Sequence, residues 1–182
     1  YGWGGARRER QGVASVPVTE QLQAANQRAG GSVDSLAAGV ADEARATPDR
    51  TYVLGPGSTL AAVKAELGFD GSPIGVDVWR DGEVLARDAD ETTLLETLES
   101  EGDNEIVVTP IGGQGFVFGR GNPQLSPAVI RRCSLSVVAS RDKLGELRVL
   151  RVDTDDPQLD EELAGWVKVR VGRFETRMVK IV

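Results

Sequence analysis

From residue 51 to residue 165 the chain alternates between short apolar runs and segments with a helical spacing of apolar residues. Runs such as "LSVVAS" are mostly apolar, which is typical of strands buried on both faces. Between the runs, stretches such as 59–68 place their apolar residues on one face of a helix. Strands that alternate with helices pair mostly in parallel. The sequence therefore predicts an α/β fold with a mostly parallel sheet and flanking helices.

Two stretches predict antiparallel hairpins attached to that sheet. Asp81-Gly82 separates two alternating runs, which is the signal of a tight two-residue turn. The segment 166–182 alternates apolar with charged residues and predicts two more strands. Asp90 and Ser126 stand at the starts of two predicted helices, where their side chains can accept hydrogen bonds from unpaired backbone N–H groups.

The first 50 residues have a different pattern. Residues 1–16 are rich in glycine and arginine without any period and predict an irregular arm. Two helical patterns follow, at 18–31 and at 34–46, with Asp34 able to cap the second. We therefore expect an arm with two helices over residues 1–50 and the α/β portion over residues 51–182.

Composition excludes several kinds of function. The chain has no histidine, which removes Ser-His-Asp and Cys-His catalysis and zinc sites that need imidazole. Its single cysteine, Cys133, cannot form an internal disulfide, which fits a reducing cytoplasm. A formal net charge of −7 argues against nucleic-acid binding. The chain contains no run of about 18 apolar residues, so the sequence predicts no membrane span. The only methionine is Met178, so we expect the chain to be processed or to be a piece of something longer.

A glycine-proline-glycine turn between a predicted strand and a predicted helix is the first candidate site. Gly55 and Gly57 flank the proline, and the N–H groups at the start of the following helix can bind an anion such as a phosphate. Ser58 and Thr59 can cap the helix and can also donate to phosphate oxygens. The turn lacks the Gly-Lys-Ser/Thr end of a P-loop, and an ordinary strand-to-helix turn is an equally good interpretation.

The second candidate site is the glycine-rich block "TPIGGQGFVFGRGNPQ". Its glycines allow a ligand to approach the backbone, its arginine offers a planar fork for phosphate, and its amides suit the edge of a base or nicotinamide. The alternative is a glycine-rich hairpin with two core phenylalanines and a solvated arginine. The residues that we single out are Thr109, Gly112, Gly113, Gln114, Gly115, Arg120, Asn122 and Gln124.

The acidic residues give weaker signals. Asp77 lies between Val76 and Val78, so we expect its side chain to point away from the valine face, into a cleft or into water, of which water is the favoured alternative. It is the one residue that we name as a candidate catalytic carboxylate, and the catalytic residues are otherwise unknown. The acidic run at 152–163 is explained by helix capping and a solvated face, and we assign no metal site there.

Three blocks of the sequence resemble a known family. They are "YVLGPGSTLAAVKAELG", "GVDVWRDGEVLARDADE" and "VVTPIGGQGFVFGRGNPQLSPAVIRR". The chain resembles the NAD-kinase-like proteins of archaea and bacteria, of the acetoin-catabolism-protein-X type, and the tail "LRVDTDDPQLDEELAGWVKVRVG" is similar to the ending of that family. The segment "TPIGGQGF" is also similar to the "TPTGSTAY" segment of true NAD kinases, which contributes to the dinucleotide pocket there.

The resemblance implies an NAD-kinase-like fold, a nucleotide partner of the NAD or ATP type, and phosphoryl transfer from ATP or polyphosphate to NAD or a related substrate, with Mg²⁺ bound to the ATP. The family's N-terminal domain carries a glycine-glycine-aspartate-glycine-threonine motif that these residues lack, which implies that the chain is the C-terminal portion. Two alternatives stay open. One is a non-catalytic nucleotide sensor. The other is a structural module whose glycines pack a subunit interface, which would make the protein a homo-oligomer.

Overall fold

The computed structural model describes residues 20–182, with side chains from residue 33 onward. The arm predicted at 1–16 lies outside the described residues. The prediction of two helices before residue 50 is wrong, because a single helix, α1 (Glu20–Arg45), covers both patterns. Gly30-Gly31 costs such a helix only about 1 kcal/mol per glycine relative to alanine, and Asp34 lies inside the helix rather than at its start. Residues 32–182 form one compact unit.

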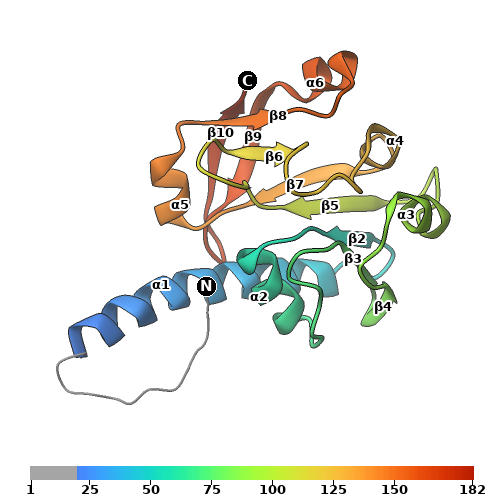
Figure 1. Cartoon of the computed structure of the whole chain (residues 1–182). Helices are drawn as coiled ribbons and strands as arrows, with labels where there is room; N and C mark the ends of the chain where they lie inside the picture. The colour runs from blue at the N-terminus through green and yellow to red at the C-terminus, as the bar shows by residue number, and fades with distance from the viewer. Residues whose placement is uncertain (1–19) are drawn as a thin grey trace. The chain divides into compact units, whose positions relative to one another are not determined.

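Within the described residues nine strands form one mixed sheet in the order β4-β3-β2-β5-β7-β9-β10-β8-β6 (Figure 1). The strands are β2 (Thr51–Leu54), β3 (Asp77–Arg80), β4 (Glu83–Ala86), β5 (Asn104–Val108), β6 (Phe116–Phe118), β7 (Ser134–Val138), β8 (Val149–Val152), β9 (Gly165–Arg170) and β10 (Thr176–Ile181). The helices after α1 are α2 (Ser58–Glu66), α3 (Glu91–Thr97), α4 (Pro127–Ile130), α5 (Arg141–Glu146) and α6 (Pro157–Leu163).

The strand directions confirm the predicted α/β class. Strands β2, β5, β7 and β9 are parallel neighbours, and β3 and β4 extend the sheet as an antiparallel hairpin. Strand β10 pairs with β9 antiparallel, and β8 and β6 then run parallel to β10. As a result β6 and β8 run in the opposite direction to β5. Strand β6 belongs to the glycine-rich block, so its pairing with β8 places the later part of that block beside β8.

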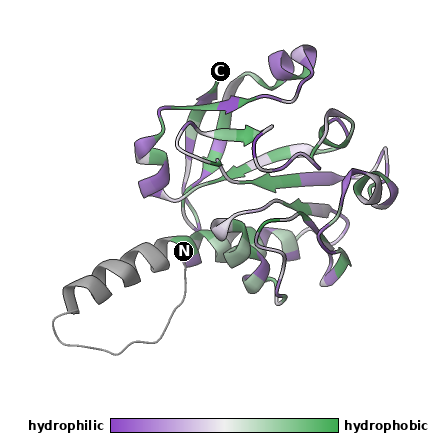
Figure 2. Ribbon diagram, in the orientation of Figure 1, coloured by the Kyte–Doolittle hydropathy of each residue, from purple (hydrophilic) through white to green (hydrophobic). Residues whose placement is uncertain are grey.

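The sheet has a hydrophobic core on each face, which explains why the central strands are mostly apolar. In β2, Val53 belongs to the core that contains residues of α3 and α4, whereas Tyr52 and Leu54 belong to the core that contains residues of α1 and α2. Figure 2 shows the hydrophobic colour along the central strands and the hydrophilic colour on the outer helices α5 and α6. Burial on both faces is the rule for parallel strands covered by helices.

Local signals in the sequence are also confirmed. The turn between β3 and β4 has positive φ angles of 47° at Asp81 and 82° at Gly82, as a tight hairpin requires. Asp90 accepts a hydrogen bond from the Thr93 N–H at the start of α3, and Ser126 caps α4 in the same way. Helix α5, which Ser140 caps, has no counterpart among the predicted elements, because six residues are too few for a helical period.

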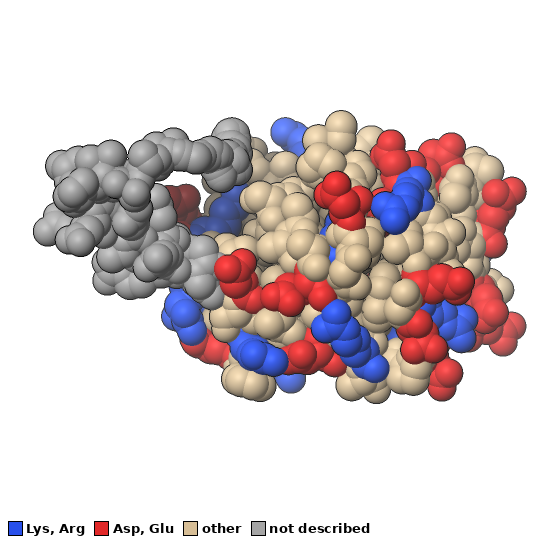
Figure 3. All heavy atoms as spheres, turned by 90° about the horizontal axis from the view of Figure 1, so that it is seen from below, with Lys and Arg blue, Asp and Glu red and all other residues tan. Residues whose placement is uncertain are grey.

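Two further observations concern the distribution of charged side chains on the surface and the length and hydrophobicity of the helices. Acidic and basic side chains are interspersed on the face of the molecule drawn in Figure 3. Within residues 20–182, no helix is both long enough and apolar enough to cross a membrane.

Candidate functional site

The two candidate segments meet at the carboxyl ends of β2 and β5. These strands pair in parallel with Leu54 opposite Val107, and the Gly55 N–H donates to the Val107 carbonyl at 2.9 Å. A Cβ atom placed on Gly57 would lie 3.1 Å from the Thr109 methyl carbon Cγ2. The carboxyl ends of neighbouring parallel strands are the usual place for ligands in α/β sheets. The glycine-proline-glycine turn and the start of the glycine-rich block therefore lie side by side.

Helix α2 begins directly after the glycine-proline-glycine turn and has no side-chain cap. Gly57 is the N-cap residue, so the prediction that Ser58 or Thr59 caps the helix is wrong. Both residues instead lie in the first helical turn, and Ser58 is exposed. In contrast, α3, α4, α5 and α6 are each capped by an aspartate or a serine. Because no side chain caps α2, its first N–H groups are available to an anion.

Gly57 itself has a structural role. Its φ of 110° is in the region that favours glycine, and its N–H donates to the Pro73 carbonyl at 3.0 Å. The Gly57 N–H is therefore not open to a ligand, and any larger residue at this position is strained. Candidate anion contacts in this turn are the N–H groups that follow Gly57.

The glycines after Pro110 fall into two groups. Gly112 and Gly113 are exposed, and a Cβ atom on either would have no neighbour within 4 Å. Gly112 has a φ of 73°, so its backbone favours glycine, whereas Gly113 has neither a positive φ nor a steric need for glycine. Open space in front of Gly113 is what a ligand-contacting glycine would show.

Gly115 and Gly119 are explained by packing, which corrects the expectation that Gly115 makes room for a ligand. Gly115 is buried with a φ of 81°, and a Cβ atom there would lie 2.9 Å from the Val149 carbonyl of β8. Gly119 has a φ of 96°, and a Cβ atom there would overlap the Asp153 carbonyl. Both glycines allow β6 to lie close to β8.

The polar side chains of the block are arranged differently from the prediction. Asn122 is fully buried, its Nδ2 donates to the Val117 carbonyl at 3.0 Å, and its Oδ1 accepts from the Gly119 N–H at 3.3 Å. Its amide therefore holds the turn after β6, and the expectation that it faces a ligand edge is wrong. Gln124 is half-buried, and its Oε1 has no hydrogen-bond partner among the described residues.

Arg120 is exposed and stacks on an aromatic ring. Its guanidinium carbon lies 4.5 Å from the centre of the Phe116 ring, a cation–π contact. Arg120 follows the carboxyl end of β6, whereas the Gly112-Gly113 turn precedes the amino end of this strand. Arg120 is connected to that turn through Phe116.

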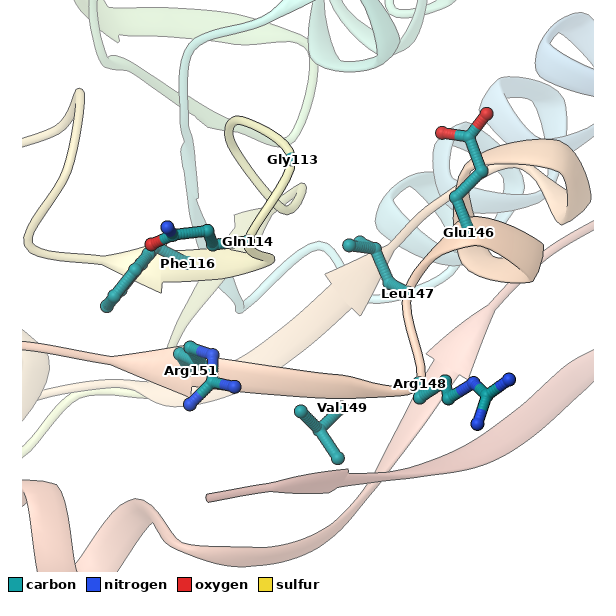
Figure 4. A pocket seen from close by; sticks show the side chains of 8 residues that line it. All are labelled: Gly113, Gln114, Phe116, Glu146, Leu147, Arg148, Val149 and Arg151. Carbon is teal, nitrogen blue, oxygen red and sulfur yellow. The ribbon is translucent and has the colours of Figure 1, made fainter.

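A cavity of about 490 Å³ lies between the glycine-rich block and the connection from α5 to β8 (Figure 4). This volume is within the range of small-molecule sites, roughly 300–1,000 Å³. Two arginines and one glutamate supply its charges, and Phe116, Leu147 and Val149 supply apolar surface. The lining residues are Gly113, Gln114, Phe116, Glu146, Leu147, Arg148, Val149 and Arg151.

Three cations near the block were not predicted from the sequence. Arg148 and Arg151 line the cavity from the β8 segment, and Lys143 of α5 places its Nζ 3.4 Å from the Gly112 carbonyl. They are distant in sequence from the glycines, and the pairing of β6 with β8 brings Arg148 and Arg151 beside them. The other candidate residues of the block do not line the cavity; they are Thr109, Gly112, Gly115, Arg120, Asn122 and Gln124.

Asp77 is fully buried, and the expectation that it faces water is wrong. Its Oδ2 lies 2.8 Å from the Nζ of Lys64, which is also fully buried. Its two oxygens also accept hydrogen bonds from the Ser72 and Asp88 N–H groups, both at 2.9 Å. This burial leaves no path for a substrate to reach the Asp77 carboxylate.

Cys133 lines a separate cavity of about 350 Å³, and burial raises the pKa of its thiol to about 12. We expect iodoacetamide at pH 8 to alkylate the native chain at least about 100-fold more slowly than the urea-unfolded chain, because the thiolate is the reactive form. The stability that the neutral thiol contributes is fully present below the ordinary thiol pKa of about 8.5 and is lost as pH rises toward 12. Mass spectrometry of alkylated Cys133 measures the rates, and equal rates would contradict the burial.

Among the described residues, no group of three or more Asp, Glu, Cys or His side chains is placed to hold a metal ion. The cavity itself contains only one carboxylate, that of Glu146.

Comparison with known protein families gives a match over the part of the chain that contains the candidate site. The family model of the ATP-NAD kinase C-terminal domain matches residues 48–181, which include both candidate segments and the cavity. The comparisons with curated proteins and with solved structures found no match. The family match confirms the resemblance of the glycine-rich block to NAD-kinase-like proteins, and it covers most of the chain. The chain therefore belongs to the ATP-NAD kinase C-terminal domain family.

Proposed function

We propose that this chain is the nucleotide-binding C-terminal portion of an NAD-kinase-like protein and that its cavity beside Gly113 binds NAD or ATP. Membership of the family gives the chain a nucleotide-related role. The observation that carries the proposal is that Gly113 and Gln114, from the most family-like block, line one cavity with Arg148 and Arg151. Gly113 is a glycine that packing within the chain does not require, Gln114 supplies an amide, and the two arginines supply guanidinium groups. Together these groups suit a phosphorylated planar ligand.

Each part of the cavity has a counterpart in a nucleotide. Arg148 and Arg151 can bind phosphate oxygens through paired N–H groups. Phe116 and Val149 offer apolar surface to a base or nicotinamide ring, and the Gln114 amide can pair with its polar edge. Arg120, which rests on the Phe116 ring, would then act through Phe116 unless the ligand extends beyond the cavity.

The uncapped start of α2 is proposed as a second phosphate contact, through the N–H groups and hydroxyls of Ser58 and Thr59. We expect Ser58→Glu to weaken ATP binding by at least about tenfold, because a carboxylate would repel phosphate there. The same carboxylate should leave the melting temperature unchanged or raise it, because an acidic residue in the first turn stabilises a helix by about 0.3–1 kcal/mol. Calorimetric titration and thermal melting measure the two effects.

Ala128→Glu is the matched control, because Ala128 is exposed in the first turn of α4, away from the cavity. It adds the same charge at another helix start and should leave ATP affinity unchanged. Equal affinity of wild type and Ser58→Glu would remove the α2 start from the site. Gly57→Val is a poor test of the same contact, because the φ of 110° and the nearby Thr109 methyl strain any side chain at that position.

Phosphoryl transfer in such a protein would depend on positioning and charge neutralisation, with Mg²⁺ bound to ATP rather than to a protein metal site. The glycine-glycine-aspartate-glycine-threonine motif does not occur in the chain, which favours a nucleotide sensor as the second candidate function. NADP formation from NAD and MgATP by the chain together with a domain that carries this motif separates the two, because a sensor binds nucleotide without turnover even then. We also propose a cytoplasmic location, which the single cysteine fits.

A further inference from the structure

A buried ion pair lies beneath the loop between α2 and β3. Lys64 and Asp77 are both fully buried, and Lys64 Nζ lies 2.8 Å from Asp77 Oδ2. Lys64 Nζ also donates to the Ser72 carbonyl at 2.8 Å and to the Gly75 carbonyl at 3.3 Å. Asp77 accepts from the Ser72 and Asp88 N–H groups. All of the polar atoms of this pair are therefore used to hold the loop and its exit into β3.

The loop in turn holds the turn at the start of α2. Pro73, which follows Ser72, accepts the hydrogen bond from the Gly57 N–H at 3.0 Å. Gly57 is the N-cap of α2 and lies against Thr109. The loop fits closely over the pair, because a Cβ atom on Gly71 would overlap the Lys64 stem and would lie 2.6 Å from Asp77 Oδ2. A continuous set of contacts thus connects the ion pair to the proposed phosphate contact.

A buried ion pair is a poor source of stability, because taking both charges out of water offsets their attraction. Such pairs are better explained where they select one conformation of the chain. We infer that the Lys64–Asp77 pair is a positioning element that fixes Gly57 through Ser72 and Pro73 and thereby sets the affinity of the α2 start for a nucleotide phosphate. The effect on affinity rests on the proposed function, whereas the effect on Gly57 does not.

Amide hydrogen exchange in the wild-type chain tests the positioning without any substitution. If the pair, the loop and the turn open as one unit, the Gly57, Ser72 and Asp88 amide protons will exchange with the same opening constant to within about twofold. An opening constant for Gly57 that differs from those of Ser72 and Asp88 by more than tenfold would overturn the inference.

The variant Lys64→Met/Asp77→Asn removes the charges together and leaves no unpaired charge in the core. We expect it to remain folded by circular dichroism, to exchange the Gly57 amide at least tenfold faster than wild type, and to bind ATP at least tenfold more weakly. The control Arg50→Gln/Asp103→Asn removes the ion pairs of Arg50 with Asp103 and Glu105 at the amino ends of β2 and β5, the opposite edge of the same strands. The control should match wild type within twofold in Gly57 exchange and ATP affinity.

If the folded double variant exchanges the Gly57 amide at the wild-type rate, the pair does not position Gly57. If it binds ATP with wild-type affinity, the pair does not set the affinity of the α2 start. Absence of ATP binding by the wild-type chain would overturn the proposed function and the effect on affinity, and the exchange measurements would then decide the positioning of Gly57 alone. If the double variant fails to fold, the linkage among the three wild-type amides decides whether the pair positions Gly57.

Discussion

Arg148→Ala/Arg151→Ala is expected to weaken ATP binding by at least about a hundredfold, because a charge-assisted hydrogen bond to phosphate contributes about 1.5–3 kcal/mol and the variant removes two arginines. Both arginines line the cavity beside Gly113. Isothermal titration calorimetry of wild type and variant with ATP, NAD and NADP measures the loss. Melting temperatures should agree closely, because Arg148 and Arg151 are exposed.

Arg177→Ala is the control for charge, and it removes one positive charge where the double variant removes two. Arg177 is also exposed but lies outside the cavity lining, with Glu175 at 3.5 Å. Its loss changes the net charge in the same direction without removing a cavity cation, so affinity should change by less than about twofold. If the double variant and Arg177→Ala bind ATP as the wild type does, the cavity is not the nucleotide site.

Gly119→Ala is expected to destabilise the fold by at least about 3 kcal/mol, because the added methyl overlaps the Asp153 carbonyl and the backbone has a φ of 96°. The clash involves backbone on both sides, so no side-chain rotation relieves it. Urea unfolding followed by circular dichroism measures the change.

Gly113→Ala is the comparison within the same block. A methyl group there has open space and an ordinary backbone, so the free energy of unfolding should stay within about 0.5 kcal/mol of wild type. Any loss of ATP affinity in Gly113→Ala is then caused by contact with the ligand. A stable Gly119→Ala would contradict the close approach of β6 to β8.

The features that the sequence predicted correctly are local ones. The Asp81-Gly82 hairpin and the Asp90 and Ser126 caps depend on a few neighbouring residues whose conformations their chemistry selects. The α/β class follows from the alternation of apolar runs and helical spacing, which is also a local pattern. Parallel pairing of β2 with β5 then brings the two predicted segments together.

The cavity could not be predicted, because it depends on which strands become neighbours. Strand β6 has three residues and pairs with β8, and this pairing alone brings Arg148 and Arg151 to Gly113. It also explains Gly115 by the nearby Val149 carbonyl, where the sequence alone favoured a ligand. No local pattern carries that information.

The burial of Asp77 did have a signal in the sequence. Lys64 follows Leu60 by four residues and therefore lies on the apolar side of α2, where a lysine needs a partner. Asp77 stands between two core valines on the next strand. A lysine in an apolar stripe and an aspartate in a buried strand together indicate a buried ion pair.

Backbone NMR of the ¹⁵N-labelled chain during titration with ATP and with NAD tests most directly whether the cavity beside Gly113 binds a nucleotide. We predict saturable shifts of the Gly112, Gly113 and Gln114 amides together with those of residues 148–151, and smaller shifts at the start of α2. Saturable shifts confined to other parts of the chain, or no saturable shift with either nucleotide, would contradict nucleotide binding in this cavity.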